Sequence, residues 1–451
     1  MKPRDRQILQ IALPSIVSNI TVPLLGLIDV AIVGHLGSPA YIGAIAVGGM
    51  LFNIIYWIFG FLRMGTSGMT SQAFGKRDLP EVVRLLLRSV SIGLAVAFCL
   101  ILLQTPIRQG AFLLIHPTDE VKEMATCYFH ICIWGAPAML GWFIGMQNSR
   151  IPMYIAITQN VVNIIASLGL VYLCGMKVEG VALGTLIAQY AGFLMGIVLW
   201  MHNYGRLKRF WEIKNYKLKI KGGEGAGIWE KGAMFRFFQV NRDIFLRTLC
   251  LVAVTLFFTS AGASQGEIIL AVNTLLMQLF TLFSYVMDGF AYAGEALSGR
   301  YIGARNREAF TDTVRHLFGW GAVIAVLFTL VYALGGNAFL GLLTDDKEVI
   351  AVADTYFYWA LAVPAVGIAA FIWDGIFIGA TATRGMLLSM AAAAVSFFIL
   401  YYGLHPVLAN HALWLAFLTY LLMRGVVQTG LSREVIRRAF PSKKEPAWRE
   451  G

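Results

Sequence analysis

Charged residues are scarce in this chain of 451 residues. Only 14% are Asp, Glu, Lys or Arg, while 58% are hydrophobic, whereas a soluble domain carries about a quarter charged residues. The five cysteines lie in or beside apolar segments without metal-ligand spacing, so we expect packing residues and neither disulfides nor a metal site. No Walker A, H-E-x-x-H or paired C-x-x-C motif is present, which leaves ATP hydrolysis and zinc chemistry without support.

Long apolar segments recur along the whole chain instead. Each has roughly 20 residues, enough to cross about 30 Å of hydrocarbon as a helix whose backbone groups are paired internally. The pattern predicts an all-α membrane protein of about twelve transmembrane helices. The expected spans are 8–33, 41–63, 88–108, 123–145, 151–173, 179–201, 234–260, 267–296, 314–344, 353–379, 386–408 and 411–432.

The net charge of +11 is distributed unevenly between the loops. Basic residues gather at the N-terminus, in every second loop and in the C-terminal tail. This asymmetry is typical of cytoplasmic loops and predicts that both termini lie in the cytoplasm. The placement indicates membrane topology rather than nucleic-acid binding.

A polar, basic segment separates the spans into two sets of six. We predict an N-terminal lobe at 1–201, a basic cytoplasmic linker at 202–232, a C-terminal lobe at 233–434 and a cytoplasmic tail at 435–451.

Two pairs of segments resemble each other at nearly the same offset and indicate a duplication. Ser71–Asp78 matches Gly299–Asn306, and Gly141–Arg150 matches Gly375–Arg384. Six spans per half predict parallel repeats related by a pseudo-two-fold axis along the membrane normal. Two such halves around a cleft are the usual plan of a secondary transporter.

Asp29 is the sharpest functional candidate, because an ionisable residue deep in an apolar span is costly and marks an ion pathway by default. It could carry a proton or, with further oxygen ligands, hold Na⁺. Asn160, Asn163 and Ser167 form a polar stripe on the fifth span, and the sixth begins with small residues that permit close helix packing. A buried carboxylate held by neighbouring hydroxyls is the structural alternative.

Pro14 and Pro23 interrupt the first span. Proline removes a backbone donor and kinks a transmembrane helix, so the first span is expected to bend and Pro14 is a candidate hinge.

The second half carries several carboxylates within its spans. Asp288 and Glu295 share a face of the eighth span with Met277 and Tyr292, and Asp374 lies in the tenth. Such a wall suits a cationic, apolar substrate.

Pairing with the arginines of the seventh span is the alternative for these carboxylates. Asp288 and Asp374 could each pair with Arg242 or Arg247. Asp243 and Arg247, at i and i+4, are expected to neutralise each other.

The chain resembles the multidrug and toxic compound extrusion (MATE) transporters, and within them the DNA-damage-inducible protein F (DinF) branch. The resemblance covers nearly all of the chain. It is carried by Ala12–Asp29, Val33–Gly37, Ala271–Leu276, Met287–Tyr292, Asp374–Ala380 and Asn410–Ala416.

The resemblance implies twelve helices in two lobes of a bacterial inner-membrane protein that expels organic cations against H⁺ or Na⁺. Asp29 matches the family's coupling carboxylate, Asn163 and Thr185 match its partners, and Asn273 lies in a matching stretch of the substrate lobe. Pro14 matches the proline at which the first helix bends. Ser167 stands where many relatives have a second aspartate, which favours H⁺ over Na⁺.

These observations predict a non-enzymatic antiporter of small organic cations or amphipathic drugs, monomeric and without cofactor or nucleic-acid partner. A lipid or lipid-linked oligosaccharide flippase is the alternative, but it would need a cationic cavity, and the noted intramembrane charges are mainly acidic. An intramembrane hydrolase would need a nucleophile–base pair within the spans, where His130 is the only deeply placed histidine.

Overall fold

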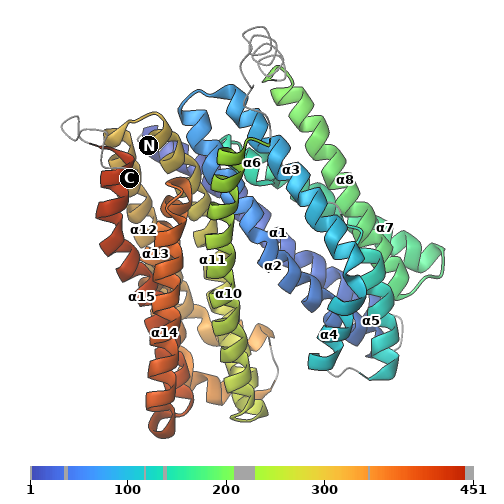
Figure 1. Cartoon of the computed structure of the whole chain (residues 1–451). Helices are drawn as coiled ribbons and strands as arrows, with labels where there is room; N and C mark the ends of the chain where they lie inside the picture. Colours follow the sequence, from blue (N-terminus) through green and yellow to red (C-terminus); the bar gives the residue numbers. More distant parts are fainter. Residues whose placement is uncertain are drawn as a thin grey trace. The chain divides into compact units, whose positions relative to one another are not determined.

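The computed structural model describes residues 3–34, 39–115, 118–135, 140–207, 229–343 and 346–441. All regular secondary structure in these ranges is helical (Figure 1). Eleven of the described helices are long and apolar enough to cross a membrane, judged by length and composition. The predicted all-α membrane fold is confirmed.

The helices follow one another through the chain with short connections. Up to the linker they are α1 (Pro3–Gly34), α2 (Pro39–Gly75), α3 (Leu79–Leu102), α4 (Gln104–Ile115), α5 (Asp119–Cys132), α6 (Leu140–Gly145), α7 (Arg150–Leu168), the π-helix η1 (Gly169–Leu173) and α8 (Val178–Tyr204). After it they are α10 (Lys231–Ala263), α11 (Glu267–Gly303), α12 (Arg307–Leu343), α13 (Lys347–Gly379), α14 (Thr383–Leu408) and α15 (Asn410–Ala439). Most of the predicted linker, at residues 208–228, and the tail from residue 442 lie outside the described residues.

The predicted fourth span, 123–145, differs most from the structure. Its residues are divided between α5, which ends at Cys132, and α6, which begins at Leu140. Neither helix alone has the length of a span. Gly135, just after α5, lowers helix propensity, and residues 136–139 of the predicted span lie outside the described residues.

The chain forms two compact units whose boundaries cut through two helices. Unit 1 comprises Met1–Ile16, Ser67–Arg77 and Arg236–Gly451, and unit 2 comprises Val17–Thr66 and Asp78–Phe235. The first turns of α1 and the last turns of α2 therefore belong to unit 1, while the remainder of both helices belongs to unit 2.

Unit 2 has an apolar core built from α1, α2, α5 and α8. The ring of Phe129 is fully buried and stacks on Phe52 at 5.1 Å between centroids. Val33 and Val181 are also fully buried in this cluster. Of the five free cysteines, only Cys132 is buried, and it lies in the same core.

Unit 1 is organised around α13, which packs against α11, α12 and α15. The end of α2 packs on α11 within the same unit, where Gly75 lies against the Arg300 backbone, 2.8 Å from the carbonyl carbon to a Cβ placed on the glycine. Gln72 Nε2 donates to Gly379 O at 2.9 Å and to Thr381 Oγ1 at 3.2 Å. These contacts explain why the end of α2 belongs to unit 1.

The two sequence matches form the same kinds of turn in both halves. Arg77 and Arg305 occupy equivalent places after α2 and α11, with φ of 57° and 54°. Gln147 and Thr381 do the same after α6 and α13, with φ of 63° and 53°.

The hydrogen bonds of the second pair of turns also correspond. Asn148 N donates to Phe143 O at 3.0 Å, and Ala382 N donates to Phe377 O at 2.8 Å. A left-handed residue with this bonding is a regular way to end a helix. The repeated motifs are therefore helix-termination signals shared by the two halves.

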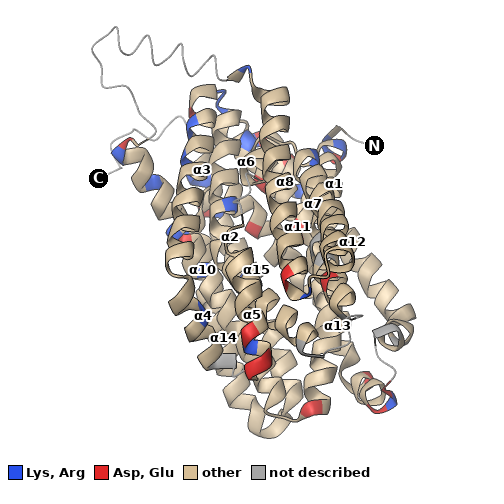
Figure 2. Cartoon of the chain, turned by 90° about the vertical axis from the view of Figure 1, so that its right-hand side faces the viewer, with Lys and Arg blue, Asp and Glu red and all other residues tan. Residues whose placement is uncertain are grey.

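Charge is concentrated at helix ends. Figure 2 shows that the middle of most helices carries neither acidic nor basic residues, and that Lys and Arg gather where α1 begins and α15 ends. This distribution is that expected of a multi-pass membrane protein.

Candidate functional site

Asp29 lies in a polar cluster formed by three helices of unit 2. Its carboxylate is only 3% exposed, and Thr185 Oγ1 donates to its Oδ2 at 3.4 Å. Asn163 Nδ2 donates to Thr185 Oγ1 at 2.9 Å. The structure thus brings together one predicted residue from each of α1, α7 and α8.

Ser167 lies on the same helix as Asn163 and is fully buried. A Cβ at Gly184 would meet the Ser167 side chain and lie 2.8 Å from its backbone nitrogen. Only glycine fits there, so residue 184 sets the close approach of α7 and α8 beside Thr185. Asp29 Oδ1, Asn163 Oδ1 and Ser167 Oγ are buried oxygens without a hydrogen-bond partner among the described residues.

Asn160 contacts a different part of α1. Its Nδ2 donates to Thr21 O at 3.0 Å, eight residues before Asp29, or about 12 Å along a helix axis. The polar stripe predicted on α7 therefore contacts α1 at two different heights along the helix axis. Of its residues, only Asn163 is hydrogen-bonded to Thr185 and through it to Asp29.

Asp374 is the centre of a second buried cluster, in unit 1. Its Oδ2 accepts from Arg247 and, at 2.5 Å, from Arg424, while Oδ1 accepts from Gln428 Nε2 at 2.6 Å. The arginine side chains are 8% and 4% exposed. Two guanidinium groups thus bond to one carboxylate, and Asp288 also acts electrostatically on Arg424.

Sequence reasoning missed Arg424 and Gln428, which lie in the last span. The signal was available, since both polar residues are four apart in an apolar helix and so share one face.

The ion pair predicted between Asp243 and Arg247 does not form. Asp243 instead accepts from Arg242 at 2.9 Å and from Thr383 Oγ1 at 3.1 Å. Arg247 donates instead to the buried Asp374 of α13. Of the two arginines weighed as partners of Asp374, only Arg247 contacts it.

The remaining predicted residues of the substrate lobe lie on α11. Asn273 forms a reciprocal amide pair with Asn410, at 2.8 and 2.9 Å, and accepts from Trp414 Nε1 at 2.8 Å. This buried network joins α11 to α15. Met277, Asp288 and Tyr292 are half-buried along α11, so these three are more accessible than Asn273.

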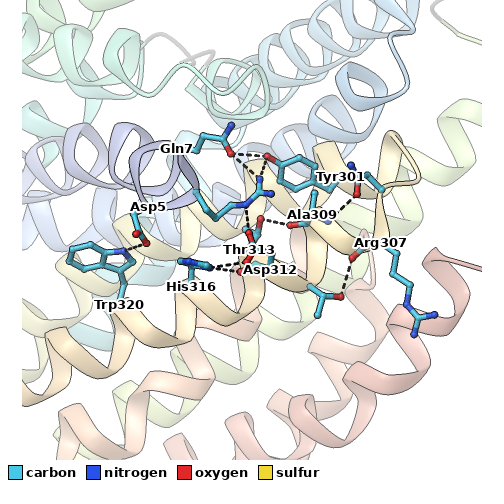
Figure 3. A network of polar contacts seen from close by, with 12 residues as sticks. Asp5, Gln7, Tyr301, Arg307, Ala309, Asp312, Thr313, His316 and Trp320 are labelled. Atoms are coloured by element: carbon cyan, nitrogen blue, oxygen red, sulfur yellow. Dashed lines mark hydrogen bonds and ion pairs between the residues drawn. The ribbon is translucent and has the colours of Figure 1, made fainter. Parts of the chain in front are cut away.

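The first turn of α1 is held on α11 and α12 by polar contacts (Figure 3). Arg4 Nε donates to Asp312 Oδ2 at 2.9 Å, and Arg4 and Gln7 both contact the Tyr301 hydroxyl. Trp320 Nε1 donates to Asp5 Oδ1 at 3.1 Å. These contacts anchor the beginning of α1 in unit 1.

Pro14 lies within the continuous helix α1, two residues before the unit boundary at Ile16. As a proline it has no N–H to donate to the preceding turn. The helix is therefore short of one hydrogen bond close to the point where it leaves unit 1.

The comparisons with known proteins agree with this architecture. The MatE family model matches residues 14–168 and 244–403. DNA damage-inducible protein F of Escherichia coli K12 is 38% identical over 428 residues, covering 94% of this chain and 90% of that protein. Multidrug export protein MepA of Staphylococcus aureus MSSA476 is 20% identical over 358 residues, covering 78% and 76%.

A solved structure shares the fold at low identity. The crystal structure of the Vibrio cholerae MATE transporter VcmN in its bent form superposes with a TM-score of 0.80 at 15% identity, covering 97% of this chain and 98% of that chain. From the family model and the Escherichia coli relative, we conclude that this chain is a membrane transporter of the MatE family and belongs to its DinF branch.

Proposed function

We propose that the protein is a secondary active exporter that expels cationic, amphipathic compounds in exchange for protons carried by Asp29. The observation that carries the proposal is a single buried carboxylate bonded to Thr185 at 3.4 Å. A carboxyl that accepts so few hydrogen bonds in an apolar span is suited to gain and lose a proton. The positive-inside pattern supports cytoplasmic termini in the bacterial inner membrane.

The donor set around Asp29 favours H⁺ over Na⁺. Na⁺ is a hard cation that needs several oxygen ligands. The hydroxyl and amide oxygens of Ser167 and Asn163 are buried. Asn160, however, contacts α1 at Thr21, eight residues before Asp29, and Ser167 stands where a second carboxylate would add negative charge. A single carboxylate with uncharged neighbours can bind a proton, because protonation neutralises its charge and needs no further oxygen ligands.

Pro14 is the proposed hinge. The start of α1 is anchored on α11 and α12 in unit 1, while Asp29 lies in the part of α1 that belongs to unit 2. A change at the carboxyl that moves α1 is most easily absorbed where the helix lacks a hydrogen bond.

The substrate site is proposed on the half-buried face of α11, with Asp288 as the attracting carboxylate and Tyr292 and Met277 as the apolar wall. Asp374 is less suited to attract a cation because two arginines already neutralise it. The name of the Staphylococcus aureus relative, a multidrug export protein, supports a drug-like substrate.

The Asp374 cluster also favours the second candidate, a flippase for lipid-linked anions. Its two buried arginines are of the residue type that binds pyrophosphate. Multidrug export remains the first proposal because both guanidinium groups are ion-paired with Asp374 and are therefore not free to bind a pyrophosphate.

Ethidium efflux from proteoliposomes tests the proposal. A pH gradient alone should drive efflux and a Na⁺ gradient alone should not. Asp29→Asn should abolish efflux in correctly inserted protein, whereas Asp119→Asn, which changes an exposed carboxylate of the same unit, should leave it intact.

Efflux driven by Na⁺ alone would overturn the proton assignment. Efflux retained by Asp29→Asn would overturn the mechanism. Translocation of a labelled lipid-linked pyrophosphate without any ethidium efflux would establish the flippase instead.

A further inference from the structure

A cavity of about 960 Å³ opens in unit 1, far in sequence from the Asp29 cluster. It lies where the ends of α2, α11, α13 and α15 meet the beginnings of α10 and α14. Five basic side chains line it, namely Lys76, Arg236, Arg305, Arg384 and Arg438. They come from widely separated parts of the chain, so the fold gathers them at one place.

The acidic residues of the cavity do not neutralise this charge. Glu434 forms an ion pair with Arg438 at 2.5 Å. Asp243 forms an ion pair with Arg242 and accepts a hydrogen bond from Thr383. Within the described ranges, the remaining four basic residues form no ion pair. Like charges around one cavity repel each other, and an anion bound among them removes that repulsion.

The uncharged lining combines polar side chains, Gln72, Gln239, Thr381 and Thr383, with apolar ones. The apolar ones include Val240, Ile302, Leu388, Leu431 and Val435. Leu388, one turn into α14, is 53% exposed. A lining with a basic rim and an apolar side fits an amphiphile whose head is anionic and whose chain continues along a helix.

The beginning of α14 adds donors to the same cavity. Its N-cap residue, Ala382, provides no side-chain cap, and Thr383 and Arg384 follow directly. The first N–H groups of a helix attract phosphate oxygens, particularly beside an arginine.

Residues 208–228 and 442–451 lie outside the described residues. The first segment contains six basic and two acidic residues, and the second contains three basic and two acidic residues. Both segments carry net positive charge, so neither provides a net counter-charge for the five basic side chains of the cavity.

We propose that this cavity binds the phosphate headgroup of an anionic phospholipid, with an acyl chain along Leu388. Basic pockets between transmembrane helices are known to accept such headgroups. Arg236 and Arg384 supply charge, and Arg305 closes the rim from the turn between α11 and α12. The proposal does not depend on the coupling ion or on the exported compound.

Lipid titration of the purified full-length protein tests the site. Native mass spectrometry in detergent compares phosphatidylglycerol with zwitterionic phosphatidylcholine, with inorganic phosphate as a separate competitor. The variant R236Q/R305Q/R384Q should bind phosphatidylglycerol roughly 100-fold more weakly, at about fivefold for each basic residue removed. Replacement of the same three residues by Lys should preserve most of the binding.

The control R6Q/R77Q/R433Q removes the same charge from exposed residues of unit 1 outside the cavity. It should bind phosphatidylglycerol like the unchanged protein. Equal loss in both triple variants would show a diffuse charge effect and overturn the site. Full displacement of the lipid by millimolar inorganic phosphate, or equal binding of phosphatidylcholine, would overturn the lipid assignment.

Discussion

The Asp374 cluster makes a strong prediction about stability, because it is a buried set of charges. Asp374→Asn removes the carboxylate that bonds to both Arg247 and Arg424, and it leaves these buried guanidinium groups without that ion pair. Removing one partner of a buried ion pair costs about 3–5 kcal/mol. For a unit of about 240 residues, this corresponds to a melting temperature lower by roughly 6–20 °C.

The double variant D374N/R424Q sharpens the test. Counting only Arg247, Arg424 and Asp374, the unchanged protein has two positive charges and one negative, the single variant has two positive charges, and the double variant has one. The double variant should therefore be more stable than D374N, even though it contains more substitutions. Such a reversal is the signature of an electrostatic coupling and not of lost packing.

Detergent-solubilised protein, followed by size-exclusion chromatography after heating, provides the assay. The same variants are assayed for ethidium efflux in proteoliposomes. If D374N melts within 2 °C of the unchanged protein but loses efflux, the cluster is a transport site and the structural reasoning is refuted.

Two further predictions concern packing in unit 2 and the anchor of α1. Gly184→Ala places a Cβ against Ser167 and should lower the free energy of unfolding by about 1–3 kcal/mol and weaken efflux. Gly26→Ala, whose Cβ has nothing within 4 Å, should melt at or slightly above the temperature of the unchanged protein. A loss of stability as large in Gly26→Ala as in Gly184→Ala would contradict the packing argument. Arg4→Gln removes the half-buried bond to Asp312 and should raise amide hydrogen exchange in residues 3–16 with little change in melting temperature. Arg6→Gln, an exposed neighbour, should not raise it, and exchange unchanged by Arg4→Gln would show that the contacts in Figure 3 do not hold the helix.

The arrangement around Asp29 was largely predictable. A carboxylate inside an apolar span is costly enough to demand polar neighbours, and Asn163 follows helical spacing on a nearby span. Asn160 shows the limit of that argument. Periodicity identifies the face of a helix, but the level at which two helices meet depends on their packing.

The pairing of charges in unit 1 was less predictable. Asp243 and Arg247 are neighbours on one helix, yet Arg247 bonds to Asp374, 127 residues away. Short sequence separation favours a weak surface pair, whereas a buried carboxylate requires the strongest donors within reach. Which donors are within reach depends on tertiary packing.

The length of α2 illustrates a different limit. The apolar pattern predicts a span ending at residue 63, but the helix continues to Gly75. Its last turns are rich in small and hydroxylated residues that carry no hydropathy signal. They are helical because they pack against α11 and α13 in unit 1.

The division of α1 between the two units links the ion site to the rest of the molecule. Asp29 lies in the part of α1 that belongs to unit 2, and Arg4 anchors the same helix in unit 1. Because the helix is covalently continuous, a displacement of its Asp29 end must either strain the Arg4 anchor or bend the segment between them. Pro14 removes a hydrogen bond from that segment, close to the unit boundary. The proposed mechanism therefore predicts that α1 bends near Pro14 and that the contacts of Arg4 with Asp312 and Tyr301 persist while the Asp29 end of α1 moves.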